Sequence, residues 1–279
     1  MKAIVLTFDK YRILTDHMIS RYNCIWPTHP FVFYIPFQQT EVKKYFEEKY
    51  GSTVHLIKTP SDIVRTMRVL LDNIQDEEWI YWCMDDRYPI QINLTKMNQV
   101  YSWIQTMNAP DVTGVRCINY PFGRMPENIY YFKDSIRNQY GMKFLKRKNN
   151  YNMIWAHQFM RIKVLKRLFS EIPLELKAAK DMDFIVEKLQ LPADHNMYVL
   201  KSNIISLGES SSRGKITQNC YESLLKNGFK IPREFEISTK NRYYKDEYPL
   251  ISSSYLFIKQ IIKTLMTKIG LSIINKKRQ

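Results

Sequence analysis

Short apolar runs alternate with amphipathic segments along the first ninety residues of the chain. Apolar runs, each typical of a buried parallel strand, cover residues 3–8, 31–35 and 79–84, and a further strand is expected over residues 54–57. Three intervening segments have the period of a helix: residues 13–24, residues 41–50, and the stretch that begins at Ser61 as its expected N-cap. This alternation of strand and helix predicts an α/β fold with a mostly parallel sheet flanked by helices.

The same alternation continues less regularly through the second half of the chain. Further helices are expected over residues 94–107, 162–169 and 181–190, and further strands over residues 111–120, 153–157 and 197–206. Residues 208–215, which combine Gly, Ser and basic side chains, are expected to form a flexible loop. His157 follows an apolar run, and we interpret it as a surface or core histidine rather than a ligand.

Carboxylates follow two of the expected strands. Asp9 comes after the first strand, and the pair Asp85-Asp86 comes directly after the fourth. Ligands of parallel α/β sheets bind at the carboxyl ends of the strands, so we expect these residues to share one crevice. Adjacent carboxylates on a rigid strand can hold a hard divalent cation, which prefers oxygen ligands and phosphates. The alternative for this pair is a set of solvated loop residues or a helix cap.

Composition and charge narrow the class of protein. With 279 residues and 45% hydrophobic content, the chain is neither disordered nor fibrous. Its 42 Lys and Arg against 27 Asp and Glu give a net charge of +15, which indicates a polyanionic partner: nucleic acid, an anionic membrane or a phosphorylated substrate. The four cysteines form no CxxC pair, which argues against a local zinc site and a disulfide framework. No apolar stretch is long enough to span a membrane.

Several short motifs follow one another between residues 3 and 232. They are LTFDKY at residues 6–11, IWP at 25–27, DDRY at 85–88, the segment 153–168, and RGK at 213–215 followed by GFKI at 228–231. In this order they resemble the TCDKY, WP, DDYF, acceptor-side and rGKw…GI motifs of a group of bacterial GT-A-type glycosyltransferases, similar to enzymes of capsule and lipopolysaccharide loci. Three departures matter. Phe8 replaces the family's Cys, and Met84 replaces the first DxD carboxylate. Lys180–Phe184 matches the WEFE segment with Asp in place of both Glu and without the Trp.

The resemblance implies a GT-A-like (Rossmann-like) fold and a nucleotide-sugar-dependent, hexosyltransferase-like enzyme. Such an enzyme moves a sugar from a nucleotide-sugar donor to a hydroxyl of a lipid-linked glycan in surface polysaccharide synthesis. By the same resemblance, the residues that contact the nucleotide-sugar are Thr7, Asp9, Tyr11, Asp85, Arg213 and Lys215. Asp85 and Asp86 then hold Mn²⁺ or Mg²⁺, and either Asp181 or Asp183 is the catalytic base, if the reaction inverts.

The carboxy-terminal segment has a different pattern. We expect a glycosyltransferase domain over residues 1–235 and a tail over residues 236–279. Within the tail, residues 252–279 carry six cations and no acid, and their apolar residues have helical spacing. This pattern predicts an amphipathic helix that binds an anionic membrane surface, which places the protein on the cytoplasmic face of the cell membrane. A helix that packs on the protein's own body is the alternative.

Two other function classes fit parts of the pattern. A nucleic-acid-binding protein or metal-dependent nuclease could use the basic surface and the paired carboxylates; it predicts further carboxylates near Asp85-Asp86 and a continuous basic groove. A non-catalytic membrane-bound scaffold is the third possibility. The motif order favours the transferase, with which no nucleic-acid partner is expected.

Overall fold

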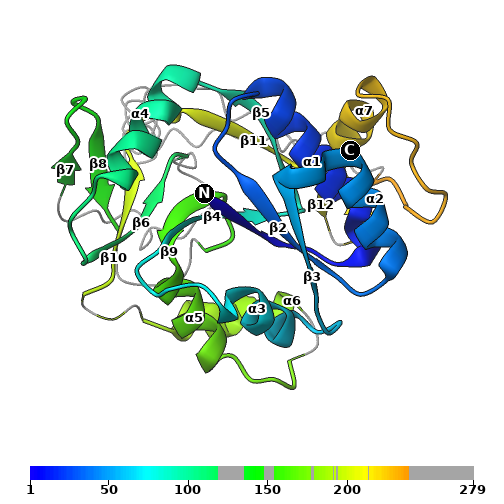
Figure 1. The fold of residues 1–279 in the computed structure, drawn as a ribbon, viewed down its shortest axis with the longest axis horizontal. Coiled ribbons are helices and arrows are strands. Elements are labelled where there is room, and N and C mark those ends of the chain that lie inside the picture. Colours follow the sequence, from blue (N-terminus) through cyan, green and yellow to red (C-terminus); the bar gives the residue numbers. More distant parts are fainter. Residues whose placement is uncertain are drawn as a thin grey trace, which may run out of the picture.

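A nine-stranded sheet organises the protein in the computed structural model, which describes residues 1–118, 135–147, 154–176, 179–190, 192, 194–212 and 214–238 (Figure 1). Its strands are β1 (Lys2–Leu6), β2 (Val32–Phe37), β3 (Val54–Lys58), β4 (Trp79–Met84), β6 (Val112–Arg116), β7 (Ser135–Arg137), β8 (Lys143–Lys146), β9 (Gln158–Arg161) and β10 (Asn196–Leu200). They lie in the order β3-β2-β1-β4-β9-β6-β10-β8-β7. All run in one direction except β8 and β9. An antiparallel strand, β9, therefore separates the parallel strands β4 and β6.

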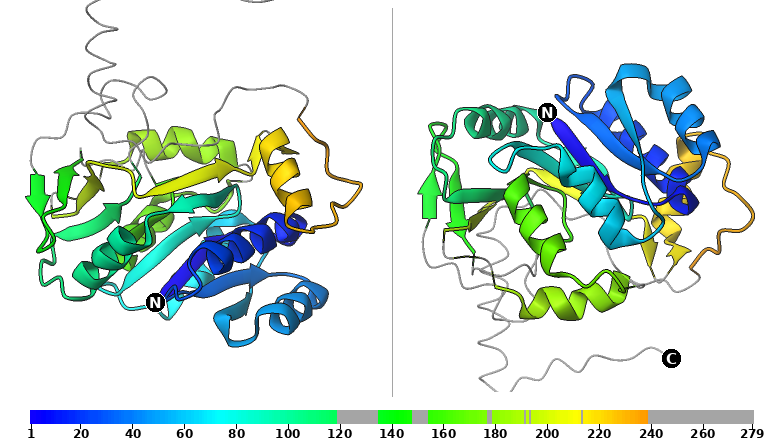
Figure 2. Two further views of the ribbon diagram at one scale, coloured as in Figure 1. Left: turned by 90° about the horizontal axis from the view of Figure 1, so that it is seen from above. Right: turned by 60° about the horizontal axis from the view of Figure 1, so that its bottom comes forward.

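Helices cover both faces of the sheet (Figures 1 and 2). One layer contains α1 (Arg12–Ile25), α2 (Thr40–Tyr50), α4 (Leu94–Gln105) and α7 (Gln218–Lys226). The other contains α3 (Ile63–Asp72), α5 (Ile162–Glu171) and α6 (Ala179–Lys188), which come forward in the right panel of Figure 2. Ala3 and Val5 of β1 face the first layer, and Ile4 and Leu6 face the second. Because both faces are buried, β1 and β4 are apolar over nearly their whole length. The predicted α/β fold with a mostly parallel sheet flanked by helices is confirmed.

Two small antiparallel sheets lie beside the main one. β5 (Arg87–Ile92) pairs with β11 (Ile205–Glu209), and β12 (Ser211–Ser212) pairs with β13 (Lys215–Ile216). β5 begins immediately after the carboxylate pair, so β11 and the residues that follow it come to lie next to that pair. This arrangement positions the candidate site.

The structure corrects several expected boundaries. The strand expected over residues 153–157 starts later, as β9, and the run over residues 197–206 forms two strands, β10 and β11, because the chain turns between them. The N-cap of α3 is Asp62 rather than Ser61: Asp62 Oδ1 accepts a hydrogen bond from the Arg65 amide at 2.8 Å. The loop expected over residues 208–215 contains the end of β11 and the paired strands β12 and β13.

The carboxy-terminal tail, residues 252–279, lies outside the described residues, so its helix and the predicted domain boundary stay predictions. Among the helices that the structure describes, none is long and apolar enough to cross a membrane.

Candidate active site

Thr7 and Asp85 meet at the carboxyl edge of the sheet. β1 and β4 are parallel, with Leu6 opposite Met84, so the residues that follow each strand emerge side by side. The Asp85 amide donates to Leu6 O at 3.2 Å, and Thr7 Oγ1 donates to Asp85 Oδ2 at 2.6 Å. Thr15 Oγ1 of α1 lies 2.7 Å from the same Thr7 oxygen and fixes its rotamer. The ends of the first and fourth strands therefore meet through Thr7 and Asp85. The crevice expected to be shared by Asp9 and the pair Asp85-Asp86 stays a prediction.

The two carboxyl groups are costly to ionise in this place. Burial raises the pKa of Asp85 to about 8; the Thr7 hydroxyl opposes this shift, and the neighbouring Asp86 adds to it. Burial also raises the pKa of Asp86, against the effect of Arg87. The Asp86 side chain is 44% exposed overall, but its Oδ1 is buried and accepts no hydrogen bond from the described residues; Arg87 Nε lies 4.0 Å away. A cation would favour the ionised form of both groups.

The pairing of β5 with β11 brings the region of the predicted RGK motif close to the carboxylate pair. Arg87 of β5 lies opposite Glu209 of β11, with 3.8 Å between Nη2 and Oε1, and the Ser210 amide donates to Asp86 O at 2.7 Å. Lys215 follows within a few residues, but its Nζ lies 2.5 Å from Glu236 Oε2 at the surface. The predicted phosphate-binding lysine therefore already has a carboxylate partner. Arg213 lies outside the described residues.

Asp9 has a structural role that sequence patterns did not reveal. Its carboxylate accepts hydrogen bonds from the backbone amides of Gln38, at 3.1 Å, and Gln39, at 2.7 Å. Gln39 is the N-cap of α2, so Asp9 satisfies amides at the amino-terminal end of that helix. Asp9 thereby joins the turn after β1 to the turn after β2.

A cavity of about 370 Å³ opens beside this turn. It is lined by residues that follow β1, β2 and β3: Phe8, Asp9, Lys10, Tyr11, Gln38, Ser61, Asp62 and Ile63. The volume is within the range of about 300–1,000 Å³ typical of small-molecule sites, and the Phe8 and Tyr11 rings contribute flat apolar surface. The predicted residues Asp9 and Tyr11 thus line one cavity, and Thr7 links its β1 wall to Asp85.

The candidate bases are less closely tied to this site. Asp181 is in the first turn of α6 and is partly buried, while the side chain of Asp183 is outside the described residues. Met182 between them is buried against the core of the second layer. No hydrogen bond or ion pair between described residues joins Asp181 to Asp85 or Asp86, so the choice of base stays a prediction.

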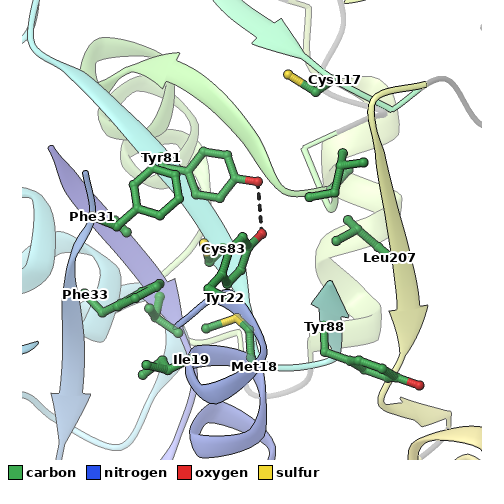
Figure 3. Close-up of a cluster of buried hydrophobic side chains, with 14 of the residues drawn as sticks. Met18, Ile19, Tyr22, Phe31, Phe33, Tyr81, Cys83, Tyr88, Cys117 and Leu207 are labelled. Atoms are coloured by element: carbon green, nitrogen blue, oxygen red, sulfur yellow. Dashed lines mark hydrogen bonds between the residues drawn. The ribbon is translucent and has the colours of Figure 1, made fainter. Parts of the chain in front are cut away.

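A buried polar chain behind the carboxylate pair was not expected from the sequence. His157 is 1% exposed, its Nδ1 lies 2.8 Å from Tyr22 OH, and Tyr22 OH lies 3.0 Å from Tyr81 OH. Figure 3 shows the two tyrosines, one from α1 and one from β4, joined through their hydroxyls within the apolar core. Burial lowers the pKa of His157 to about 4, so the imidazole is neutral at pH 7. The interpretation of His157 as a core histidine is confirmed.

Comparisons with known proteins give no family assignment. No protein-family model and no curated protein matches the chain. Among solved structures, S. aureus TarS 1–349 matches over 73% of this chain and 58% of its own, with 14% identity and a TM-score of 0.43. The galactosyltransferase LgtC, in complex with donor and acceptor sugar analogues, matches over 80% of this chain and 78% of its own, with 10% identity and a TM-score of 0.40. TM-scores this low support no argument about function.

Proposed function

We propose that this protein is a GT-A-type glycosyltransferase that moves a sugar from a nucleotide-sugar donor to a hydroxyl of a glycan acceptor. The observation that carries the proposal is the junction of β1 and β4. There the Thr7 hydroxyl donates to Asp85 of an adjacent carboxylate pair, next to a cavity of about 370 Å³ at the strand ends. The motifs resembling TCDKY and DDYF supply these residues.

The carboxylate pair fits a divalent cation, Mn²⁺ or Mg²⁺. The fit rests on the buried Asp86 Oδ1, which accepts no hydrogen bond from the described residues, and on the oxygen-only donor set of Asp85 and Asp86. Among the described residues no third Asp, Glu, His or Cys joins them in a cluster, so phosphate oxygens and water complete the coordination in this proposal. A bound cation would offset the negative charge of the donor diphosphate.

The cavity is the proposed site of the nucleoside. In this proposal Phe8 and Tyr11 contact the base and ribose, and Asp9 shapes the wall because it holds the amides of Gln38 and Gln39. Lys215 and Arg213 act on the diphosphate as it leaves. Lys215 has to exchange Glu236 for phosphate oxygens to do so, which suits a loop that closes when the donor is bound.

The transfer step needs a proton acceptor. In an inverting reaction, the acceptor oxygen bonds to the anomeric carbon while the bond from that carbon to the phosphate oxygen breaks. The hydroxyl proton passes to a carboxylate, for which Asp181 and Asp183 in the first turns of α6 are the candidates. We further propose that the acceptor is lipid-linked and that residues 252–279 hold the enzyme on the anionic inner face of the membrane.

The nucleic-acid alternative is weakened by how the basic residues are used. Residues 133–177 include much of the excess positive charge, yet four cations of this stretch already have acidic partners. Arg161 Nη1 lies 3.2 Å from Glu77 Oε2. Lys163 Nζ lies 2.9 Å from Glu77, Lys166 Nζ lies 2.8 Å from Asp76, and Arg167 pairs with Glu171 one turn along α5. Ion pairs of this kind leave less uncompensated charge for a phosphate backbone.

A ligand panel tests the proposal directly. UDP-, GDP-, dTDP- and CMP-linked sugars are added to the protein with Mn²⁺ or Mg²⁺, and the unfolding temperature is measured. A donor that binds the native state raises that temperature, and the rise should require the cation. Stabilisation by DNA, with none by any nucleotide-sugar, would favour the nuclease instead.

A further inference from the structure

The carboxyl-terminal end of β4 extends beyond one of its two neighbouring strands. On the β1 side, backbone pairing reaches the Asp85 amide, which donates to Leu6 O. Backbone groups of consecutive residues in a strand point to opposite sides, so the N–H and C=O of Met84 point toward β9. The ladder with β9 ends at Trp82, which lies opposite Gln158. At Met84, therefore, β4 needs a partner that β9 does not supply.

His157 occupies this position with its side chain. Its Nε2 lies 3.1 Å from Met84 N and 3.0 Å from Met84 O, where the next residue of a longer β9 would have paired. The neutral imidazole uses Nε2 in one of two ways: it accepts from the amide or donates to the carbonyl, according to its tautomer. In either tautomer, the imidazole ring supplies a hydrogen-bond partner that the backbone of a longer β9 would have supplied.

The imidazole is itself held from behind. Its Nδ1 pairs with Tyr22 OH of α1, and that hydroxyl pairs with Tyr81 OH of β4. The Tyr22 and His157 rings are stacked at 21°, and all three side chains are at most 1% exposed. A buried chain of this kind has little room to rearrange, so α1 holds the imidazole in place through Tyr22, and the imidazole holds Met84.

We propose that His157 is a positioning residue, which through Met84 fixes the end of β4 and so the direction in which Asp85 and Asp86 leave the sheet. The consequence of this positioning for activity rests on the proposed function, but the effect of His157 on the backbone does not. Without the imidazole, the described hydrogen bonds that still hold this segment are the Leu6 pairing, the Thr7 side chain and, after the pair begins, the Ser210 amide on Asp86 O. The carboxylates would then sample more than one arrangement.

Four variants separate positioning from a general contribution to stability. His157→Leu removes both ring nitrogens, whereas His157→Gln keeps a donor and an acceptor close to the position of Nε2. Tyr81→Phe is the matched control. It removes a buried hydroxyl from the same chain of hydrogen bonds but leaves the contact between His157 and Met84. Tyr22→Phe, which removes only the partner of Nδ1, serves if the leucine variant does not fold.

Amide hydrogen exchange of the ligand-free protein, resolved by NMR, measures the restraint. In His157→Leu the Met84 and Asp85 amides should exchange about tenfold faster relative to the amides of β2, as expected for loss of one buried hydrogen bond. His157→Gln should restore the wild-type exchange rates of these two amides. In Tyr81→Phe their exchange relative to the amides of β2 should be unchanged. In Tyr22→Phe a smaller increase confined to the same two amides is expected. Exchange that rises equally in β2, or does not rise at Met84 and Asp85, would overturn the proposal.

Affinity for UDP with Mn²⁺ is the second readout. His157→Leu should weaken it about fivefold or more, and Tyr81→Phe should leave it unchanged. A wild-type protein that binds no nucleoside diphosphate would contradict the proposed function, whereas the exchange result would still decide the role of His157.

Discussion

At the scale of single residues, the site depends on a small hydroxyl. Thr7 is 2% exposed, and its Oγ1 is the side-chain donor that Asp85 has among the described contacts. Thr7→Val keeps the shape but leaves Asp85 Oδ2 without that donor. We expect a loss of about 1–3 kcal/mol in the free energy of unfolding, measured by urea denaturation. Thr53→Val, which removes an exposed hydroxyl that bonds Tyr50 O, should cost much less. Equal losses would show that Thr7 has no special role.

A buried histidine makes the stability depend on pH. His17 of α1 is fully buried, its Nε2 lies 3.0 Å from Ser223 Oγ of α7, and burial lowers its pKa to about 4. In the unfolded chain its pKa is about 6.5. Between these values only the unfolded state takes up the proton, so stability falls as the pH falls through this window and is fully present above it.

His17→Gln isolates this contribution, because every other titrating group is shared with the wild type. From pH 7 to pH 4.5 the wild type should lose about 2 kcal/mol more than the variant does, in urea denaturation at both pH values. Parallel pH profiles for the two proteins would show that His17 is protonated equally in both states.

At the scale of elements, the contact between β5 and β11 is close-packed at one glycine. A Cβ on Gly208 would lie 2.4 Å from Tyr88 Cζ of the neighbouring strand, and Tyr88 is itself 3% exposed. Gly208→Ala should therefore cost about 1–3 kcal/mol in unfolding free energy, because the ring or the strand has to move.

A double-mutant cycle gives the sharper result at this position. On a Tyr88→Leu background the same Gly208→Ala change should cost clearly less, since the ring that it meets is gone. An equal cost on both backgrounds would place the strain elsewhere. Because Glu209 and Ser210 follow directly, the cycle also reports on how firmly β11 holds the segment beside Asp86.

The strands also differ in how well the sequence pattern predicts them. β1, β2 and β4 are mainly apolar runs, and all four strands from β1 to β4 were predicted within a few residues. β5 was missed because Arg87–Ile92 begins with a charged residue and includes Pro89, so it resembles neither a buried nor an alternating strand. β9 starts later than expected because backbone pairing with β4, rather than local pattern, decides where it begins.

Only part of the candidate site could be predicted from the sequence. Asp85-Asp86 was recognisable because an apolar strand precedes it and a known motif resembles it. The partners of the Asp9 carboxylate and of His157 Nε2 were not, because they are backbone groups: the amides of Gln38 and Gln39, and both polar groups of Met84. A backbone partner leaves no signature in side-chain chemistry.

At the scale of the whole molecule, the open prediction concerns the excess positive charge. A chain that ends before residue 252 should stay folded, because each layer has a large buried core built from residues that precede 239. It should no longer co-sediment with anionic vesicles, whereas full-length binding should weaken as salt screens the lysines. If truncation unfolds the protein, the tail packs on its body. If vesicles never bind the full chain, the membrane proposal is wrong.

The most direct test of the proposed cation-dependent glycosyltransferase site is the rate of sugar transfer by the Asp86→Ala variant. The variant should unfold at or above the wild-type temperature, because it removes a carboxyl group whose ionisation burial disfavours. Asp76→Ala, which removes an acid that is 65% exposed and pairs with Lys166, is the control for lost surface charge. Cation-dependent turnover of the nucleotide-sugar should fall by about a hundredfold or more in Asp86→Ala and stay unchanged in Asp76→Ala. Wild-type turnover by a folded Asp86→Ala protein would contradict the proposed site.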